Sequence, residues 1–417
     1  MSLEKANLEL IYDAASIRRW NDHIRPGNGF TELDKQSHKM VFAYVLAKFE
    51  ESDRKAKINW LKLIEGGIFE FLHRIVLTDI KPPIFHMLME KKGDKLNNWV
   101  LEQLRDKHGF SRIKNGFFEK MSAYFNDPEN SYLEKRILKA AHYMATNWEF
   151  EIIYNLNRSI YGLEDTKEEI SNEIEEYYDL AGVQKLMLGK KTRSFLSLVG
   201  QLRFQQRWAQ SPRVPETSVL GHMLVVAILS YFCTLEIEGC EKRIINNFFA
   251  GLFHDLPEVL TRDIVSPVKK SVEGLEDVIK EIENQQLEEK VFPLIPRAWR
   301  KEMKYLIENE FNSRIIKEGV IYFTSSDDIN KQYNEDKYNP VDGEIIRACD
   351  RFAAYIEAYL SISHGISSRY LMEGIENLYN EYKDKKIAGI DFGRMFNYFK
   401  IDTQLFQIIK QHYSQDS

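Results

Sequence analysis

The chain has 417 residues, a length that predicts roughly two or three domains rather than a single core. Its hydrophobic fraction of 44% and charged fraction of 29% are typical of a soluble globular protein. Lys and Arg number 57 against 63 Asp and Glu, so the composition predicts no general attraction to nucleic acid or to an anionic membrane. An anionic ligand would therefore have to be bound by local charges.

We expect no targeting or membrane segment in this sequence. Its first residues include acidic side chains and no long apolar run, so we expect no ordinary signal peptide. The most apolar stretch, Met223 to Cys233, is shorter than the about 20 residues that cross a bilayer, and we expect it to be a buried core helix. The three cysteines have no CxxC spacing, which predicts reduced thiols and a cytoplasmic location.

Apolar residues recur with a helical period along the whole chain, for example in residues 60–68, 137–145 and 345–356. Proline and glycine fall mainly between such segments, at residues 26–27, 82–83, 212–215 and 293–296. Alternating strand patterns are scarce. The sequence therefore predicts an all-α fold.

Two parts of the chain resemble each other through landmarks that occur in the same order, at a spacing that grows from 184 to 208 residues because the second part holds 24 extra residues. The matched landmarks are residues 79–84 with 263–268 and His38 with His222, each pair 184 positions apart, Arg19-Trp20 with Arg207-Trp208, and residues 139–142 with 347–350. Four landmarks in the same order predict two tandem copies of one helical domain, residues 1–185 and residues 186–417.

The two copies differ in their ionisable residues. At the spacing of 184, the corresponding pairs are His254 with Glu70, Asp255 with Phe71, and Glu258 with Arg74. Phe71 cannot bind a metal ion, and Arg74 places a positive charge where the second copy has a carboxylate. We therefore expect the first copy to be inactive and without a metal site, and His38 and His142 to be hydrogen-bonded histidines without a ligand role.

A short stretch of the second copy carries most of the candidate chemistry. An apolar segment, residues 248–253, is followed closely by His254, Asp255, Glu258 and Asp263. Burying so many ionisable groups is costly unless something pairs with them, and a metal ion is the usual partner. The alternative is that Asp255 caps a helix end while Glu258 faces solvent.

Two further candidates lie on apolar helices. His222 begins the most apolar helix of the chain, where a lone histidine is more often a core residue than a ligand. Asp350 is surrounded by apolar residues and needs a partner, which a metal ion or a salt bridge to Arg347 or Arg351 would provide.

The order His, His-Asp and Asp on three successive helical segments resembles the HD-domain superfamily of metal-dependent phosphohydrolases, and within it the 5′-deoxynucleotidase-like branch. The residues that carry the resemblance are Arg207-Trp208 (with Arg207 fifteen positions before His222), the run from His254-Asp255 through Glu258 and Asp263 to Pro267-Val268-Lys269, and Asp350. The resemblance covers roughly residues 200–365. The chain departs from it at Gly221, where the family has a glutamate, and at Leu256, where the family has a small residue, so the substrate preference stays open.

The resemblance implies that His222, His254, Asp255 and Asp350 bind one divalent metal ion. Two imidazoles and two carboxylates suit Mn, Co, Fe, Ni or Zn, but not a structural zinc of the thiolate type. Such an ion activates water for attack on phosphorus. Glu258 and Asp263 would exchange protons during the reaction, although Asp263 is equally suited to cap the helix that follows.

Three residues are candidates for contacts with the substrate. Arg207 suits a bidentate grip on phosphate, Trp208 offers a flat wall for a sugar or base, and Lys269 is a further phosphate ligand. The alternatives are an architectural Arg-Trp pair, which its recurrence in the first copy favours, and a solvated lysine.

Two insertions of the second copy are polar. Residues 273–290 predict a charged amphipathic helix. Residues 324–339 predict a mobile loop that acts as a lid or specificity loop, or else is a plain surface excursion.

The function expected from these residues is a phosphomonoesterase acting on nucleoside 5′-monophosphates or similar small phosphate esters. The alternatives are a phosphodiesterase or pyrophosphohydrolase of a signalling nucleotide, and a non-catalytic nucleotide- or metal-sensing module. Single-copy members of the resembling family form dimers, so the two halves here are expected to pack as an intramolecular pseudo-dimer.

Overall fold

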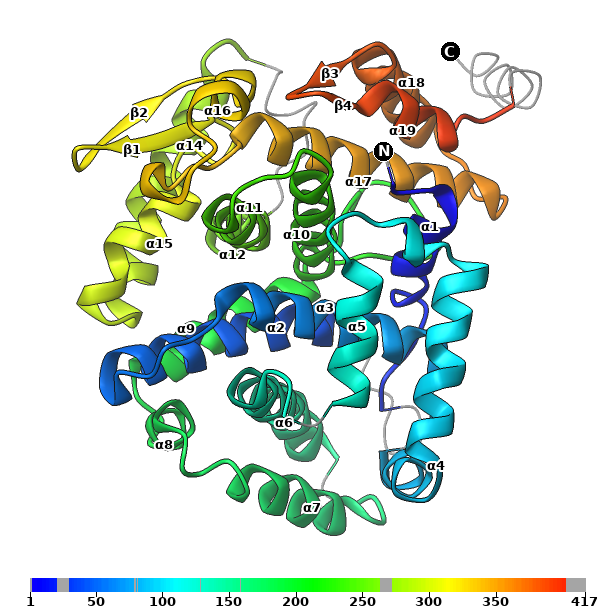
Figure 1. The fold of residues 1–417 in the computed structure, drawn as a ribbon, viewed down its shortest axis with the longest axis vertical. Coiled ribbons are helices and arrows are strands. Elements are labelled where there is room, and N and C mark those ends of the chain that lie inside the picture. The colour runs from blue at the N-terminus through cyan, green and yellow to red at the C-terminus, as the bar shows by residue number, and fades with distance from the viewer. Residues whose placement is uncertain are drawn as a thin grey trace.

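The computed structural model describes residues 2–20, 30–78, 80, 82–127, 129–157, 159–262 and 272–402. Within this part the chain is overwhelmingly helical and its strands form only two short hairpins, which confirms the predicted all-α class (Figure 1). The longer helices stack in crossing layers, with α2 and α3 across the middle of the molecule.

The bounds of the elements follow the chain. The helices of the first half are α1 Lys5–Asp13, α2 Glu32–Phe49, α3 Trp60–Leu77, α4 Pro82–Glu102, α5 Phe117–Asn126, α6 Tyr132–Leu156, α7 Leu163–Glu175, α8 Ala181–Met187 and α9 Lys191–Gly200. Those of the second half are α10 Val219–Glu236, α11 Glu241–Phe253, α12 Glu258–Thr261, α14 Leu275–Gln286, α15 Arg300–Ile307, α16 Ser326–Gln332, α17 Gly343–Ser363, α18 Arg369–Tyr382 and α19 Phe392–Tyr398. The antiparallel hairpins are β1 Arg314–Lys317 with β2 Val320–Phe323, and β3 Lys386–Ile387 with β4 Ile390–Asp391.

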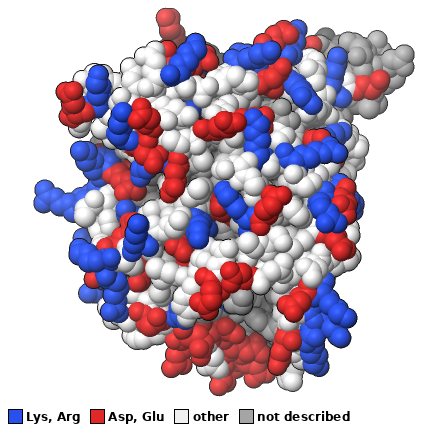
Figure 2. Space-filling view, in the orientation of Figure 1, with Lys and Arg blue, Asp and Glu red and all other residues white. Residues whose placement is uncertain are grey.

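Charges of both signs are interspersed over the face of the molecule in Figure 2. Acidic side chains gather at the end where α7 lies. This helix begins with Glu164 and Asp165 in its first turn and has no basic residue in its last turn.

Helix α10 lies at the centre of the molecule. All of its residues from Val219 to Leu235 are buried, as expected for the apolar stretch that the sequence places there. By length and hydropathy it is the one helix of the described residues that could cross a membrane, but 94% of it is buried inside the fold. It is therefore a core helix.

One hydrophobic core runs through both halves of the chain. Tyr44 of α2 places its ring 5.0 Å from that of Phe249 and 5.3 Å from that of Phe253, both on α11. Nearby, the hydroxyl of Tyr231 on α10 donates to Glu65 of α3 at 3.0 Å. Helices α2 and α3 therefore pack directly against α10 and α11.

Two segments bind the halves further together. Helix α1 lies beside α17 (Figure 1), where the hydroxyl of Tyr12 donates to the carbonyl oxygen of Ala353 at 2.9 Å. Helix α9 follows residue 185 but packs on α2, and Nε2 of His38 donates to the carbonyl oxygen of Leu196 at 2.9 Å. Each half therefore buries surface that belongs to the other.

The entries to α2 and α10 are built alike. Each is preceded by one isolated antiparallel bridge, between Arg18 and Thr31 in the first half and between Gln206 and Ser218 in the second. Trp20 and Trp208 occupy the same position after the first bridge residue, and both have a positive φ, 63° and 57°. The Arg-Trp landmarks thus correspond in backbone conformation as well as in sequence.

The helix caps suggest a different pairing of residues between α2 and α10 from the one predicted by sequence spacing. Thr31 and Ser218 are the N-caps of α2 and α10, and each side chain accepts a hydrogen bond from the backbone N–H three residues on. The residue four positions after the cap is Lys35 in α2 and His222 in α10. Sequence spacing instead paired His222 with His38, which lies about one helical turn further and so close to the same face.

The polar run of residues 324–339 is not a mobile loop. It contains α16 and a short 3₁₀ turn, and it is bonded to the first turn of α11. The side chains of Asn334 and Asp336 accept hydrogen bonds from the backbone N–H groups of Cys240 and Lys242, both at 2.9 Å. The prediction was wrong because these polar residues cap free N–H groups of a distant helix, at which no side-chain cap is present locally. The segment contacts the start of α11, whereas the candidate site lies at the other end of this helix, about 20 Å away. This distance argues against a lid. The charged helix predicted at residues 273–290 is confirmed as α14 and the turn after it.

Candidate metal centre

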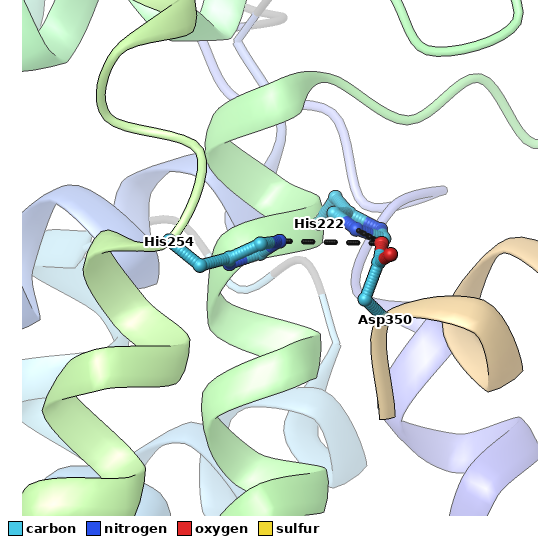
Figure 3. Close-up of side chains that lie close together, drawn as sticks. All are labelled: His222, His254 and Asp350. Carbon is cyan, nitrogen blue, oxygen red and sulfur yellow. Dashed lines mark hydrogen bonds and ion pairs between the residues drawn. The ribbon is translucent and has the colours of Figure 1, made fainter. Parts of the chain in front are cut away.

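Three helices bring the predicted ligands together. His222 lies in the first turn of α10, His254 directly follows α11, and Asp350 projects from α17 (Figure 3). One ligand atom from each of these three residues lies within 4.8 Å of the others, and all three residues are buried.

His222 is held on both sides of its ring. Its Nε2 lies 3.0 Å from Oδ1 of Asp350, and its Nδ1 lies 3.3 Å from Oε1 of Glu357. The ring is fully buried. A carboxylate behind a histidine fixes the orientation of the ring and strengthens the opposite nitrogen as a metal ligand.

His254 and Asp255 also face the cluster. Nδ1 of His254 donates to the carbonyl oxygen of Gly251 at 2.8 Å, which turns Nε2 towards Asp350 and Asp255. This Nε2 lies 3.2 Å from Oδ2 of Asp255 and 4.0 Å from Oδ1 of Asp350. Neither Nε2 of His254 nor Oδ2 of Asp255 has a hydrogen-bond partner of suitable geometry within the described residues, although both atoms are buried. Two such atoms facing one another fit a shared metal ligand.

The donor set suits a divalent ion. Oδ2 of Asp255 lies 3.9 Å from Nε2 of His222, so two imidazoles and two carboxylates converge on one place. This mixture of nitrogen and oxygen ligands is suited to Mn, Co, Fe, Ni or Zn. The alternative salt bridge of Asp350 is weak, since Nε of Arg351 lies 3.9 Å from Oδ2 of Asp350. His222 is the closer partner.

The cluster strongly perturbs the pKa values of its members. Burial and the charge of Arg207 lower the pKa of His222, but the hydrogen bonds with Asp350 and Glu357 outweigh them and raise this pKa to about 9. Burial raises the pKa of Asp255, but the adjacent imidazole outweighs it and lowers this pKa to about 2. Protons on the imidazoles thus balance the carboxylate charges, and a metal ion would take their place.

Arg207 lies at the edge of this cluster. Its guanidinium nitrogens lie 3.8 Å from Asp255, 3.9 Å from Asp350 and 3.9 Å from Glu357. The side chain is 13% exposed, so it joins the buried carboxylates to the surface of the site. A guanidinium in this position is suited to bind a phosphate group that approaches the cluster.

Trp208 is held by the fold. Its Nε1 donates to Oε2 of Glu357 at 3.1 Å. Its ring packs on α18, where a Cβ at Gly374 would lie only 2.5 Å from the indole. These contacts favour the architectural alternative for Trp208 over a wall for the substrate.

Glu357 is the residue that sequence reasoning missed. It lies seven positions after Asp350 on α17 and is buried. Besides Trp208 and His222 it binds the hydroxyl of Thr217, which donates at 2.9 Å. Burial raises its pKa, but Arg213 and the hydrogen bond with His222 lower it to about 2, so the group is a carboxylate.

The predicted correspondence between the two halves contains a signal for Glu357. Its counterpart at the spacing of residues 139–142 and 347–350 is Glu149, which accepts from Nε1 of Trp20 at 2.9 Å and from Nε of Arg19 at 2.8 Å. The first half thus repeats the contact between the Arg-Trp pair and a buried glutamate.

The remaining predicted residues are only partly described. Glu258 begins α12, is buried, and its backbone N–H donates to the carbonyl oxygen of Asp255 at 3.1 Å, which places it next to the cluster. Asp263 and Lys269 lie outside the described residues.

The fold and the buried cluster define a helical protein with a candidate metal centre of nitrogen and oxygen ligands. Residues 199–379 match the family described as HD domain, which supports a relation of this part of the chain to the HD-domain superfamily. HD domains bind divalent metal ions, and their presence indicates metal-dependent phosphohydrolase activity in general. No curated protein and no solved structure matches the chain.

Proposed function

We propose that the second half of the chain is a metal-dependent phosphomonoesterase of the 5′-deoxynucleotidase-like branch, which hydrolyses nucleoside 5′-monophosphates or similar small phosphate esters. The observation that carries the proposal is the buried cluster of two imidazoles and two carboxylates beside a partly exposed arginine. A buried site with this donor set and a guanidinium at its rim suits an ion and a phosphate group together.

Each member of the cluster has a role in this proposal. His222, His254, Asp255 and Asp350 hold one divalent ion, and Glu357 fixes the ring of His222 from behind. The ion, when bound, supplies Lewis acidity that activates water for attack on phosphorus.

The other residues act on substrate and protons. Arg207 binds the phosphate of the substrate, and Glu258, buried beside the cluster, exchanges protons with the attacking water or the leaving oxygen. Asp263 and Lys269 keep their proposed roles in proton exchange and phosphate binding. Trp208 acts mainly by holding Glu357.

The proposal extends to the whole chain. We infer that residues 1–185 and 186–417 are tandem copies of one domain that pack as an intramolecular pseudo-dimer, and that only the second copy is catalytic. The matched bridges before α2 and α10 and the shared core support this inference. A cytoplasmic location and small phosphorylated partners, without nucleic acid or membrane, complete the proposal. The three cysteines are free thiols, as such a location requires.

Substitution of Asp255 tests the site. The Asp255→Ala variant should lose both bound metal and phosphate release from nucleoside monophosphates, because one ligand of a buried set is removed. The exposed Asp106→Ala variant is the matched control and should behave as wild type. Full metal content together with full activity in Asp255→Ala would show that the centre is elsewhere.

A substrate panel separates the alternatives. Phosphate release from monophosphates alone supports a phosphomonoesterase, and release from cyclic or pyrophosphate-linked nucleotides supports a phosphodiesterase or pyrophosphohydrolase. Metal and nucleotide binding without turnover would identify a sensing module.

A further inference from the structure

The first half contains a counterpart of the metal centre, and packing identifies its residues. A glycine in the middle of α3 and another near the end of α11 each lie against the helix that carries the first ligand position. Gly67 packs against Met40 of α2, and Gly251 packs against Ala227 of α10. Met40 and Ala227 each lie nine residues after the N-cap of their helix. Three residues after each glycine stand Glu70 and His254. Glu70 therefore occupies the place of His254, as Lys35 occupies that of His222.

Lys35 has an unusual environment for a lysine. Its side chain is fully buried, and its Nζ contacts the imidazole of His142, the counterpart of Asp350, with 3.4 Å to Nε2. It forms no ion pair with a carboxylate of the described residues. A buried ammonium without a carboxylate partner is strongly unfavourable, and burial lowers the pKa of Lys35 well below its ordinary value. An anion bound beside Lys35 would favour its charged form.

The surroundings of His142 are cationic. Burial and the charges of Lys35, Lys39, Arg19 and Arg74 all lower the pKa of this imidazole. The wider cluster joins five basic side chains to three carboxylates, namely Arg19, Lys35, Lys39, Arg74 and Arg203 with Glu32, Glu70 and Glu149. Asp34, which neighbours Arg203, is a fourth acidic group, so the basic side chains outnumber the acidic ones by one.

The metal centre has a different composition. There, four carboxylates lie with three arginines and two imidazoles, and a metal ion would replace the protons of the imidazoles: Asp255, Asp350, Glu258 and Glu357 with Arg207, Arg213, Arg351, His222 and His254. The same framework thus holds a cluster suited to a cation in one half and a positive cluster, rich in basic side chains and suited to an anion, in the other.

The positive cluster reaches the surface. The side chains of Arg19 and Arg74 are 14% and 20% exposed, comparable with the 13% of Arg207. Their guanidinium nitrogens approach the same oxygen, Oε2 of Glu32, at 3.0 Å and 3.8 Å. Two guanidinium groups held on one carboxylate oxygen, close to a buried lysine, are suited to the several oxygens of a phosphate group.

We propose that the first half contains a metal-independent anion site, formed by Arg19, Lys35 and Arg74, that binds the phosphate group of a small phosphorylated molecule. The site does not hydrolyse its ligand, because the positions of the metal-binding residues are occupied by Lys35, Glu70 and Phe71. Bound phosphate supplies the negative charge that Lys35 lacks. This proposal does not depend on turnover in the second half.

Titration of the full-length protein in EDTA with inorganic phosphate tests the proposal at constant ionic strength. Isothermal titration calorimetry should show one saturable site. Arg74→Gln should weaken it by about tenfold or more, since a charge-assisted contact is lost. Arg207→Gln, in the metal centre, and Arg105→Gln, an exposed arginine outside the cluster, should leave it unchanged. A parallel titration with a nucleoside 5′-monophosphate identifies the source of the phosphate. A higher affinity for the nucleotide than for inorganic phosphate indicates a nucleotide ligand, and an equal affinity indicates free phosphate.

A second variant separates a ligand site from a structural lysine. Lys35→Met removes the buried charge at similar volume, so it should abolish phosphate binding while the phosphate-free protein melts at the same or a higher temperature. Loss of saturable binding in Arg207→Gln but not in Arg74→Gln would overturn the proposal, since the phosphate would then lie in the second half. The absence of saturable binding to the wild-type protein would overturn it too.

Discussion

Replacing Glu357 by glutamine tests how the metal centre is organised. The carboxylate accepts hydrogen bonds from Nε1 of Trp208 at 3.1 Å and from the hydroxyl of Thr217 at 2.9 Å. One of its oxygens, Oε1, lies 3.3 Å from Nδ1 of His222. Glutamine keeps the shape but offers one acceptor oxygen and an NH₂ group that faces other donors. Hydrogen bonds to a charged group contribute about 1.5–3 kcal/mol each, so a destabilisation of about 2–4 kcal/mol is expected.

The effect on the metal is expected to be separate from the effect on stability. Groups that orient a ligating histidine typically change metal affinity by about 10–100-fold, and Glu357→Gln should weaken metal binding within that range. Chelator competition measures the affinity, and urea unfolding of the metal-free protein measures the stability. The exposed Glu373→Gln on α18 is the control. If Glu357→Gln bound metal as tightly as this control, Glu357 would not position His222.

Three further predictions concern the whole molecule. In the metal-free protein, folding raises the pKa of His222 from 6.5 to about 9, so this group contributes at most about 3 kcal/mol to stability below pH 6.5, and the contribution is lost as the pH rises to 9. The melting temperature in EDTA should therefore fall between pH 6.5 and 9, and added metal should stabilise the protein more at pH 9 than at pH 6.5. A melting temperature that does not change with pH would contradict this role of His222. Arg243 and Asp342 form a fully buried ion pair between α11 and the start of α17, so Asp342→Asn should destabilise the protein by about 3–5 kcal/mol in urea unfolding, and an unchanged midpoint would refute this role. Residues 186–417 alone would lose the packing of α2 on α9 and α10 and of α3 on α11, so this fragment should self-associate in size-exclusion chromatography; a stable, active monomer would count against the pseudo-dimer.

Much of the fold follows from local patterns. The 3.6-residue period of apolar side chains predicted the helical class, because a helix buries one face through residues three and four positions apart. The buried helix at Met223 to Cys233 and the charged helix at residues 273–290 were found in the same way. Local hydrogen bonding and burial decide such features, and both are visible in the order of residues.

The candidate metal ligands could also be predicted from the sequence, for a chemical reason. His254 and Asp255 end an apolar segment, where ionisable groups require a partner, and His222 and Asp350 complete the order that resembles HD domains. The structure brings three of these four within 4.8 Å and places Asp255 beside both imidazoles. Their roles as metal ligands rest on the proposal and its test.

The sequence by itself determined the helical class, the order of the elements and the residues that converge on the candidate metal centre. Only the tertiary structure decided that Glu357 stands behind His222, that Asn334 and Asp336 cap a distant helix, and that Lys35 takes the ligand's place in the first half. These three outcomes depend on contacts between residues far apart in the chain. Spacing along one helix specifies which face a residue occupies, but the partner opposite that face is set by how the helices pack.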